Sequence, residues 1–460
     1  MKREKHTRRL VENKRTASLL SQAIQRKELK SVLRLMVSLG DASVWRGLIA
    51  TPPSSLLEVV IEEFKNHTAI PLELPFFSAF SIAAQLLIER DAKIVLKNGQ
   101  KIYPDFYTVV AAQSGRSKTF SYTTIKEALH KLNTGIIEAD DPASSAALVE
   151  ILAQKRGVFW FIDEFGEFWE SLETDSHKET KRILLKAYDH SPITRRLKSK
   201  GVDKDGTPKK NLVSVEYPLL SIFATTVLER LPLQIKEEDW KSGMCQRIAF
   251  VVAQDDPSRS WSNARYWDLS AINTGRIGEA WGKLRSVSTH KEYHLPPNVV
   301  GQVARAFEFF GIRTELDEGF VRRICFRIYK YALVFHWLQG KTNNEIDSED
   351  IGYASRLAII HLSDLRGLIS LNAYSDFLDL VRRARDIKTR TGTGFDYRQV
   401  LMGLHRRVKN KEEAQLLVEV VEGHVGLGPQ NADFGSLLAI NTNLGGNRPN
   451  SAGEISKNNF

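Results

Sequence analysis

The stretch with the clearest chemical content is VVAAQSGRSKTFSY, residues 109–122. Its apolar start predicts a strand, and the sequence after the polar turn predicts a helix. A helix N-terminus and inward-facing N–H groups after a strand favour phosphate binding. In such a loop a lysine contacts the terminal phosphates of a nucleotide and a Ser or Thr contacts Mg²⁺. The predicted phosphate loop comprises Ala112, Gln113, Ser114, Gly115, Arg116, Ser117, Lys118 and Thr119.

The loop departs from the usual pattern at two positions. Ala112 and Ser117 stand where phosphate loops normally have their first and last glycine. Both side chains are small, so the loop can still close around a phosphate, but we expect backbone strain at Ser117. A short match such as SGRSKT also arises by chance, and this alternative stays open when the loop is considered alone.

A pair of carboxylates follows a second apolar strand. In GVFWFIDEF, five mostly large apolar residues end in Asp163 and Glu164, about 45 residues after the loop lysine. In nucleotide hydrolysis, the Asp would hold the Mg²⁺ shell and the Glu would polarise the attacking water. A strand followed by a helix-capping Asp is the simpler interpretation of this motif alone. The two motifs in this order favour the catalytic interpretation and predict ATP and Mg²⁺ as ligands.

Two further residues extend the set. Thr225, with Thr226, ends the apolar strand LLSIFATT, where it could touch the attacking water or the γ-phosphate. High strand propensity explains threonines there equally well. Arg247 follows the small-residue turn KSGMCQ and precedes another strand. An arginine so placed can stabilise the transition-state charge on a neighbouring subunit's nucleotide, although a single exposed arginine is often only a surface residue.

The elements that must position these residues alternate between strand and helix up to about residue 290, which predicts a parallel sheet covered by helices. Successive helical patterns follow. The expected organisation is a basic helical region over 1–70, an α/β core over 71–290, a helical lid over 291–385, a winged-helix-like module over 386–440 and a disordered tail over 441–460.

Composition narrows the class of protein. The 460 residues carry a net charge of +10, which favours a polyanionic partner. No apolar run is long enough to span a bilayer, so no membrane association is expected. The N-terminus lacks an apolar signal core. The two cysteines, Cys245 and Cys325, cannot form a disulfide framework or a cysteine metal site. These features predict a cytoplasmic location.

The order of motifs resembles the AAA+ ring ATPases. It is more closely similar to a P-loop family of plasmids, prophages and other mobile elements, distantly like minichromosome-maintenance helicases. The resembling segments span roughly 75–370 and include VVAAQSGRSKT, GVFWFIDEF, YPLLSIFATTVLERL and SGMCQRIAFVV. The resemblance implies an α/β P-loop NTPase fold, a hexameric ring of identical chains, Arg247 as the trans-acting finger, and Arg322 or Arg323 as a phosphate sensor. It also implies a primase or polymerase as a partner.

Two basic segments are candidates for DNA contacts. The segment TRRLKSKGVDKDGTPKKNLVSVEY predicts a hairpin that turns at Asp205-Gly206, the place where replicative helicases grip single-stranded nucleic acid. Its candidate phosphate contacts are Lys198, Lys200, Lys204, Lys209 and Lys210. Arg406 and Arg407 form a second cluster that a winged helix could use against duplex DNA. Solvated lysines on a hairpin tip and a charged helix end are the alternatives.

The function predicted from these residues is an ATP-dependent DNA motor, the replicative helicase of a mobile element. The missing loop glycines motivate an alternative, a nucleotide-gated DNA-binding recruiter with weak turnover, such as a helicase loader, a replication initiator or a transposition regulator. A degenerate P-loop scaffold that binds no nucleotide is the third hypothesis.

Overall fold

The computed structural model describes residues 45–421, except for gaps at 131–137, 139–140, 143, 156, 176, 178, 197–211, 236–238, 241–242, 255–270, 312–317, 392–393, 406–407 and 409–410. The chain divides into two compact units, Ala42–Leu380 and a second formed by Met1–Asp41 with Val381–Phe460. The described elements are η1 (Arg46–Ala50), α3 (Leu56–His67), α4 (Glu73–Glu89), β1 (Lys93–Val95), β2 (Lys101–Ile102), β3 (Tyr107–Ala112), α5 (Lys118–His130), α6 (Ser145–Gln154), β4 (Val158–Ile162), α7 (Phe165–Ser171), α8 (Thr180–Tyr188), β5 (Ile193–Arg196), β6 (Leu212–Val215), β7 (Leu220–Val227), α9 (Leu231–Gln234), α11 (Gly243–Gln246), β8 (Ile248–Val252), α12 (Thr274–Ser286), β9 (Glu292–Tyr293), α13 (Pro297–Gly311), α14 (Glu318–Leu338), α15 (Ser348–Thr391), α16 (Tyr397–Gly403) and α17 (Lys411–Val421).

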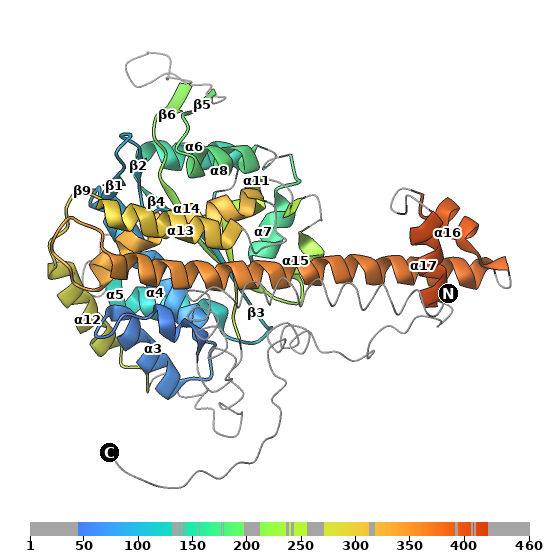
Figure 1. The fold of residues 1–460 in the computed structure, drawn as a ribbon, viewed down its shortest axis with the longest axis horizontal. Coiled ribbons are helices and arrows are strands. Elements are labelled where there is room, and N and C mark those ends of the chain that lie inside the picture. Colours follow the sequence, from blue (N-terminus) through green and yellow to red (C-terminus); the bar gives the residue numbers. More distant parts are fainter. Residues whose placement is uncertain are drawn as a thin grey trace, which may run out of the picture. The chain divides into compact units, whose positions relative to one another are not determined.

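A four-stranded, all-parallel sheet lies inside the unit Ala42–Leu380, with the strand order β4-β7-β3-β8 (Figure 1). Every residue of β3 and β8 is buried. Parallel sheets are covered on both faces, which explains why these strands are nearly continuous apolar runs rather than alternating ones. The mixed α/β architecture predicted from the alternation of strands and helices is therefore confirmed.

The strand order brings three strand ends together. In the register, Val110 of β3 lies opposite Thr225 of β7, and Ile162 of β4 lies opposite Ala224 of the same strand. β7 thus separates β3 from β4, although it follows both in the chain. Residues that follow β3 and β4 therefore meet at one edge of the sheet, beside the end of β7.

Helix α4 is buried along nearly its whole length. It packs on β3 and β7 and also contacts α14, so it has no solvent-facing stripe and its sequence is apolar on all sides. The neighbouring α3 begins after Ser55, whose side chain accepts a hydrogen bond from the backbone N–H of Glu58 at 3.3 Å. These contacts anchor the sheet to the rest of the unit.

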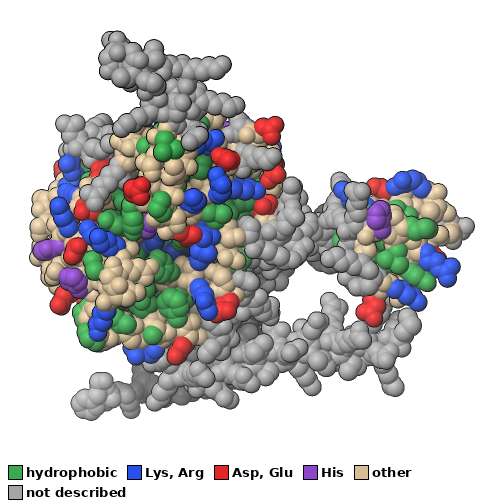
Figure 2. Space-filling model, turned by 90° about the horizontal axis from the view of Figure 1, so that it is seen from above, with side chains coloured by type: hydrophobic (Ala, Val, Ile, Leu, Met, Phe, Trp, Pro, Cys, Tyr) green, Lys and Arg blue, Asp and Glu red, His purple; other side chains and the backbone are tan. Residues whose placement is uncertain are grey.

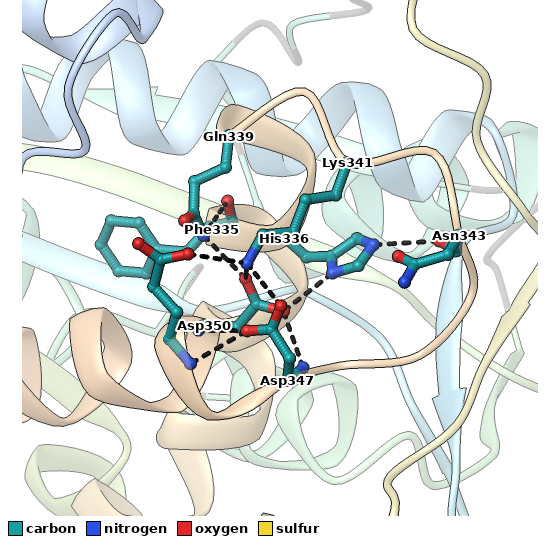
Figure 3. Close-up of polar contacts among 8 residues, drawn as sticks. Phe335, His336, Gln339, Lys341, Asn343, Asp347 and Asp350 are labelled. Atoms are coloured by element: carbon teal, nitrogen blue, oxygen red, sulfur yellow. Dashed lines mark hydrogen bonds and ion pairs between the residues drawn. The ribbon is translucent and has the colours of Figure 1, made fainter.

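The turn between α14 and α15 is organised by a buried carboxylate (Figure 3). Asp350 Oδ2 accepts from His336 Nδ1 at 2.8 Å, and its Oδ1 accepts from Gln339 Nε2 at 2.7 Å and Lys341 Nζ at 2.9 Å. His336 Nε2 lies 3.0 Å from the carbonyl oxygen of Asn343. Because each oxygen of Asp350 receives donors, the carboxylate fixes both helix ends.

We expect Asp350→Asn to lower the free energy of unfolding by about 1–3 kcal/mol, because an amide nitrogen would face donors that need an acceptor. Glu349→Gln is the matched control: its carboxylate lies 3.2 Å from the same Lys341 but is 59% exposed, so its change should stay within about 0.5 kcal/mol. Urea unfolding followed by circular dichroism measures both. Equal changes in the two variants would contradict the role of Asp350.

Two smaller sheets, the second of them a two-stranded ribbon, accompany the parallel sheet in this unit. β1 pairs antiparallel with β2, as a hairpin, and parallel with β9. β5 pairs antiparallel with β6, from Ile193 opposite Val215 to Arg196 opposite Leu212. Figure 1 shows this second ribbon projecting beside α6. This antiparallel pairing agrees with the hairpin predicted between the carboxylate strand and the threonine strand, whose turn at Asp205-Gly206 lies outside the described residues.

In the described part of the second unit, α16 and α17 pack against each other. Asp396 begins α16 with a capping box, in which its side chain accepts backbone N–H groups and Gln399 bonds back to the backbone of Asp396. Helix α15 continues to Thr391, past the predicted boundary at 385. No described helix is both long and apolar enough to cross a membrane.

Candidate functional site

Asp163 is held between two threonine hydroxyls at the carboxyl edge of the sheet. Its Oδ2 accepts from Thr119 Oγ1 at 2.7 Å, and its Oδ1 accepts from Thr225 Oγ1 at 2.9 Å. Thr119 comes from the first turn of α5, Asp163 follows β4, and Thr225 lies near the end of β7. Thr225 is fully buried. Three residues that the sequence predicts as site residues therefore meet through their side chains.

The loop between β3 and α5 has the backbone that the sequence analysis anticipates. Gly115 has φ +78° and Ser117 has φ +51°, both in the left-handed region. Glycine adopts that region without penalty, whereas a residue with a Cβ pays about 1–2 kcal/mol there. The strain expected at Ser117 is thus present. Within the loop, Arg116 Nη2 donates to Gln113 Oε1 at 3.3 Å.

Lys118 and Glu164 face each other across the same edge. Lys118 Nζ lies 3.9 Å from Glu164 Oε1, and the lysine side chain is 9% exposed. Glu164 has a left-handed backbone at φ +22°, a strained conformation of the kind that concentrates at functional sites. Burial raises the pKa of Glu164; Lys118 lowers it and Asp163 raises it, and the net pKa lies above its ordinary value.

The oxygen donors at this edge fit a magnesium ion. A hydroxyl and a carboxylate lie within hydrogen-bond distance of each other, and Mg²⁺ prefers one or two such oxygens completed by phosphate oxygens and water. Among the described residues, no group of three or more His, Cys, Asp or Glu side chains could hold a metal ion by itself. Thr119 and Asp163 are the residues that would bind Mg²⁺ together with a nucleotide.

Arg247 lies at the opposite end of the sheet, where its strands begin. It immediately precedes β8, whose first residue Ile248 pairs with Tyr107 at the start of β3. The loop follows the other end of β3, about 15 Å or more away at the rise of a strand. The Arg247 side chain is 10% exposed and forms an ion pair with Asp189, so it does not reach the loop of its own chain.

The predicted sensor arginines also lie away from the loop. Arg322 pairs with Glu318 on the exposed face of α14. Arg323 Nη1 is 3.7 Å from Asp189 Oδ1, and its Nε donates to Gln246 Oε1 at 3.4 Å. Arg323 thus shares a partner with Arg247, and neither predicted sensor contacts Lys118.

The predicted DNA contacts lie outside the described residues. These are Lys198, Lys200, Lys204, Lys209 and Lys210 at the hairpin tip, and Arg406 and Arg407 in the C-terminal module. On the face shown in Figure 2, the Lys and Arg side chains of the described residues are spread among acidic and hydrophobic ones. The DNA assignment therefore stays a prediction from sequence.

The structure adds residues that the sequence analysis missed. Arg230, just after β7, lowers the pKa of Glu164 and so belongs to the charge environment of the site. Its position directly after the threonine strand was the available signal. Asp189, which pairs with Arg247, gave no signal, because it ends a helix 58 residues earlier in the chain.

A scan against models of known protein families finds no match for the chain, and a search of curated proteins finds no significant relative.

Proposed function

We propose that this protein hydrolyses ATP with a P-loop core of the AAA+ type. The observation that carries the proposal is Asp163 held by Thr119 and Thr225, with the Lys118–Glu164 pair beside it. A phosphate-binding turn, a metal-binding carboxylate and a second carboxylate on neighbouring strand ends are the components of phosphoryl transfer to water. The position of β7 between β3 and β4 supports the AAA+ type, because it brings Thr225 beside Asp163 and the loop.

Each residue then has a stated task. The α5 N-terminus and the Lys118 ammonium bind the phosphates. Mg²⁺ at Thr119 and Asp163 would neutralise phosphate charge. Glu164 accepts a hydrogen bond from the attacking water and takes its proton, and Thr225 keeps Asp163 oriented. The pKa of Glu164 lies above its ordinary value, which brings this base closer to neutral pH.

We further propose that the chain works as a ring on DNA, as the helicase of a mobile element. Arg247 cannot reach its own loop, so a catalytic role for it requires a second copy. The β5–β6 ribbon lies in the chain between the carboxylate strand and the threonine strand, and its lysine-rich tip is suited to nucleic-acid phosphates. A helical lid of α13 to α15 and a winged-helix-like C-terminal module complete the proposal.

The test is ATP hydrolysis with and without single-stranded DNA, for the wild type and Glu164→Gln. We expect DNA to stimulate turnover, and the variant to bind ATP while its turnover falls by roughly 10²-fold or more. Glu170→Gln is the matched control, since this exposed acid lies on the same helix α7. Wild-type turnover that falls as the pH drops through the raised Glu164 pKa would support the base role.

The nucleotide-gated recruiter remains the second candidate, and the strain at Ser117 favours it. Tight ATP binding with ATP-dependent assembly on DNA, but without turnover or strand separation, would select it over the motor. A chain that binds no ATP at all would leave only the degenerate scaffold.

A further inference from the structure

Asp189 makes a two-point contact with Arg247. The carboxylate follows the last residue of α8, and its Oδ1 accepts from Arg247 Nε at 3.1 Å while Oδ2 accepts from Nη2. Arg247 Nη1 also donates to the carbonyl oxygen of Gly243 at 2.7 Å. A bidentate contact fixes the plane of a guanidinium as well as its position. The contacts use three of its five N–H groups.

A second arginine converges on the same carboxylate. Arg323 of α14 lies 3.7 Å from Asp189 Oδ1, and Arg327, one turn further, donates through Nη2 to the carbonyl oxygen of Gln246 at 3.0 Å. Burial and the positive charge of Arg247 lower the pKa of Arg323. The cluster therefore holds more positive charge than Asp189 neutralises. A purely structural ion pair needs only one arginine, whereas this excess suits an incoming anion.

Two members of the cluster, Asp189 and Arg323, are accessible from outside the unit through a cleft. The cleft has a volume of about 830 Å³, and Asp189 and Arg323 are among its lining residues. The side chain of Asp189 is 41% exposed, whereas that of Arg247 is 10% exposed. Arg247 also lies over the ring of Tyr188, 5.8 Å from its centroid. The arginine is thus packed on one side by an aromatic ring and held on another by the exposed carboxylate.

We propose that Asp189 is a positioning residue for Arg247, holding its guanidinium in the orientation that meets the terminal phosphate bound by a second copy of the chain. This inference rests on the proposed function. An arginine held before the reaction needs no reorganisation when charge develops on the phosphate. In this role Asp189 acts through Arg247 and leaves the loop of its own chain unchanged.

The first measurement is ATP turnover of full-length Asp189→Asn. We expect kcat to fall on the order of tenfold to a hundredfold, as a small misplacement of a charged group allows, with KM for ATP unchanged. Glu173→Gln is the matched control: its carboxylate pairs with Lys181 of α8 at 2.9 Å and is 61% exposed. This control should retain wild-type turnover. ATP-dependent assembly, followed by light scattering, should be the same for all three chains.

Mixing experiments separate positioning from a general structural role. A mixture of Asp189→Asn with Lys118→Ala should regain turnover, because one chain supplies an intact loop and the other an intact Arg247 with its carboxylate. A mixture of Asp189→Asn with Arg247→Ala should not, because both lack the same half of the shared site. Recovery in the first mixture also shows that the Asp189→Asn chain is folded.

Failure of the positioning role can be told apart from failure of the proposed function. If Lys118→Ala and Arg247→Ala do not restore turnover to each other, no site is shared between chains and the ring proposal fails. If they do, but Asp189→Asn turns over like the wild type or faster, then only the positioning role is overturned. A faster variant would mean that Asp189 restrains Arg247 instead.

Discussion

Replacing Lys118 with alanine is expected to reduce ATP turnover by roughly 10²- to 10³-fold, the usual cost of losing one donor to developing negative charge. It should also weaken ATP binding. The ammonium stands at the start of α5, and Glu164 Oε1 is 3.9 Å from it. The helix N-terminus survives the substitution, so some phosphate affinity remains. Turnover and the binding of a fluorescent ATP analogue measure the two effects separately.

The matched control for Lys118 is Lys126→Ala on the same helix. Lys126 pairs with Glu138 and its side chain is 35% exposed, so its loss tests whether any lysine of α5 affects turnover. We expect little change. Wild-type turnover in Lys118→Ala would be incompatible with a phosphate loop at residues 112–119, however the other residues behave.

Replacing Lys330 with methionine is expected to lower the free energy of unfolding by about 3–5 kcal/mol, the cost of leaving a buried charge without its partner. Lys330 and Asp105 are 1% and 0% exposed, with Nζ 3.1 Å from Oδ1. His190 Nε2 remains 2.9 Å from the other carboxylate oxygen. Arg182→Met, which breaks an exposed pair with Glu179, should cost under about 1 kcal/mol. Urea unfolding of both variants checks this.

The buried pair also predicts a pH dependence. Burial alone would raise the pKa of Asp105, but Lys330 and His190 outweigh it and hold the pKa below its ordinary value. The folded state therefore binds this proton more weakly than the unfolded state. The contribution is present above about pH 4, the ordinary carboxylate range, and is lost as the pH falls through the lowered pKa.

In Lys330→Met, burial would dominate the pKa of Asp105 and raise it. Protonation would then relieve the buried charge, so the stability difference between wild type and variant should narrow on acidification. Urea unfolding of both chains between about pH 3 and pH 7, a range that includes the ordinary carboxylate pKa, tests whether the difference narrows. A constant difference across that range would show that Asp105 is not the group that Lys330 neutralises.

The sequence by itself determined the local parts of the site. Apolar runs mark β3, β4 and β7, and polar residues at their ends mark the candidate site, because the carboxyl ends of parallel strands face the same way. Small residues between the strand and the helix indicated the loop. The serine at position 117, where such loops usually have glycine, indicated backbone strain. These inferences depend only on residues that are close together in the chain, so the sequence alone is enough to make them.

Only the tertiary structure decided which distant groups meet. Thr225 reaches Asp163 because β7 enters between β3 and β4, a pairing order that strand patterns do not encode. Asp189 meets Arg247 across 58 residues, and Lys330 meets Asp105 across 225. Charged residues on helices normally face water, so nothing in a helical pattern identifies the one that packing encloses. The order of the strands and the packing of the helices on the sheet determine which of these residues meet, and both are set by the burial of the core as a whole.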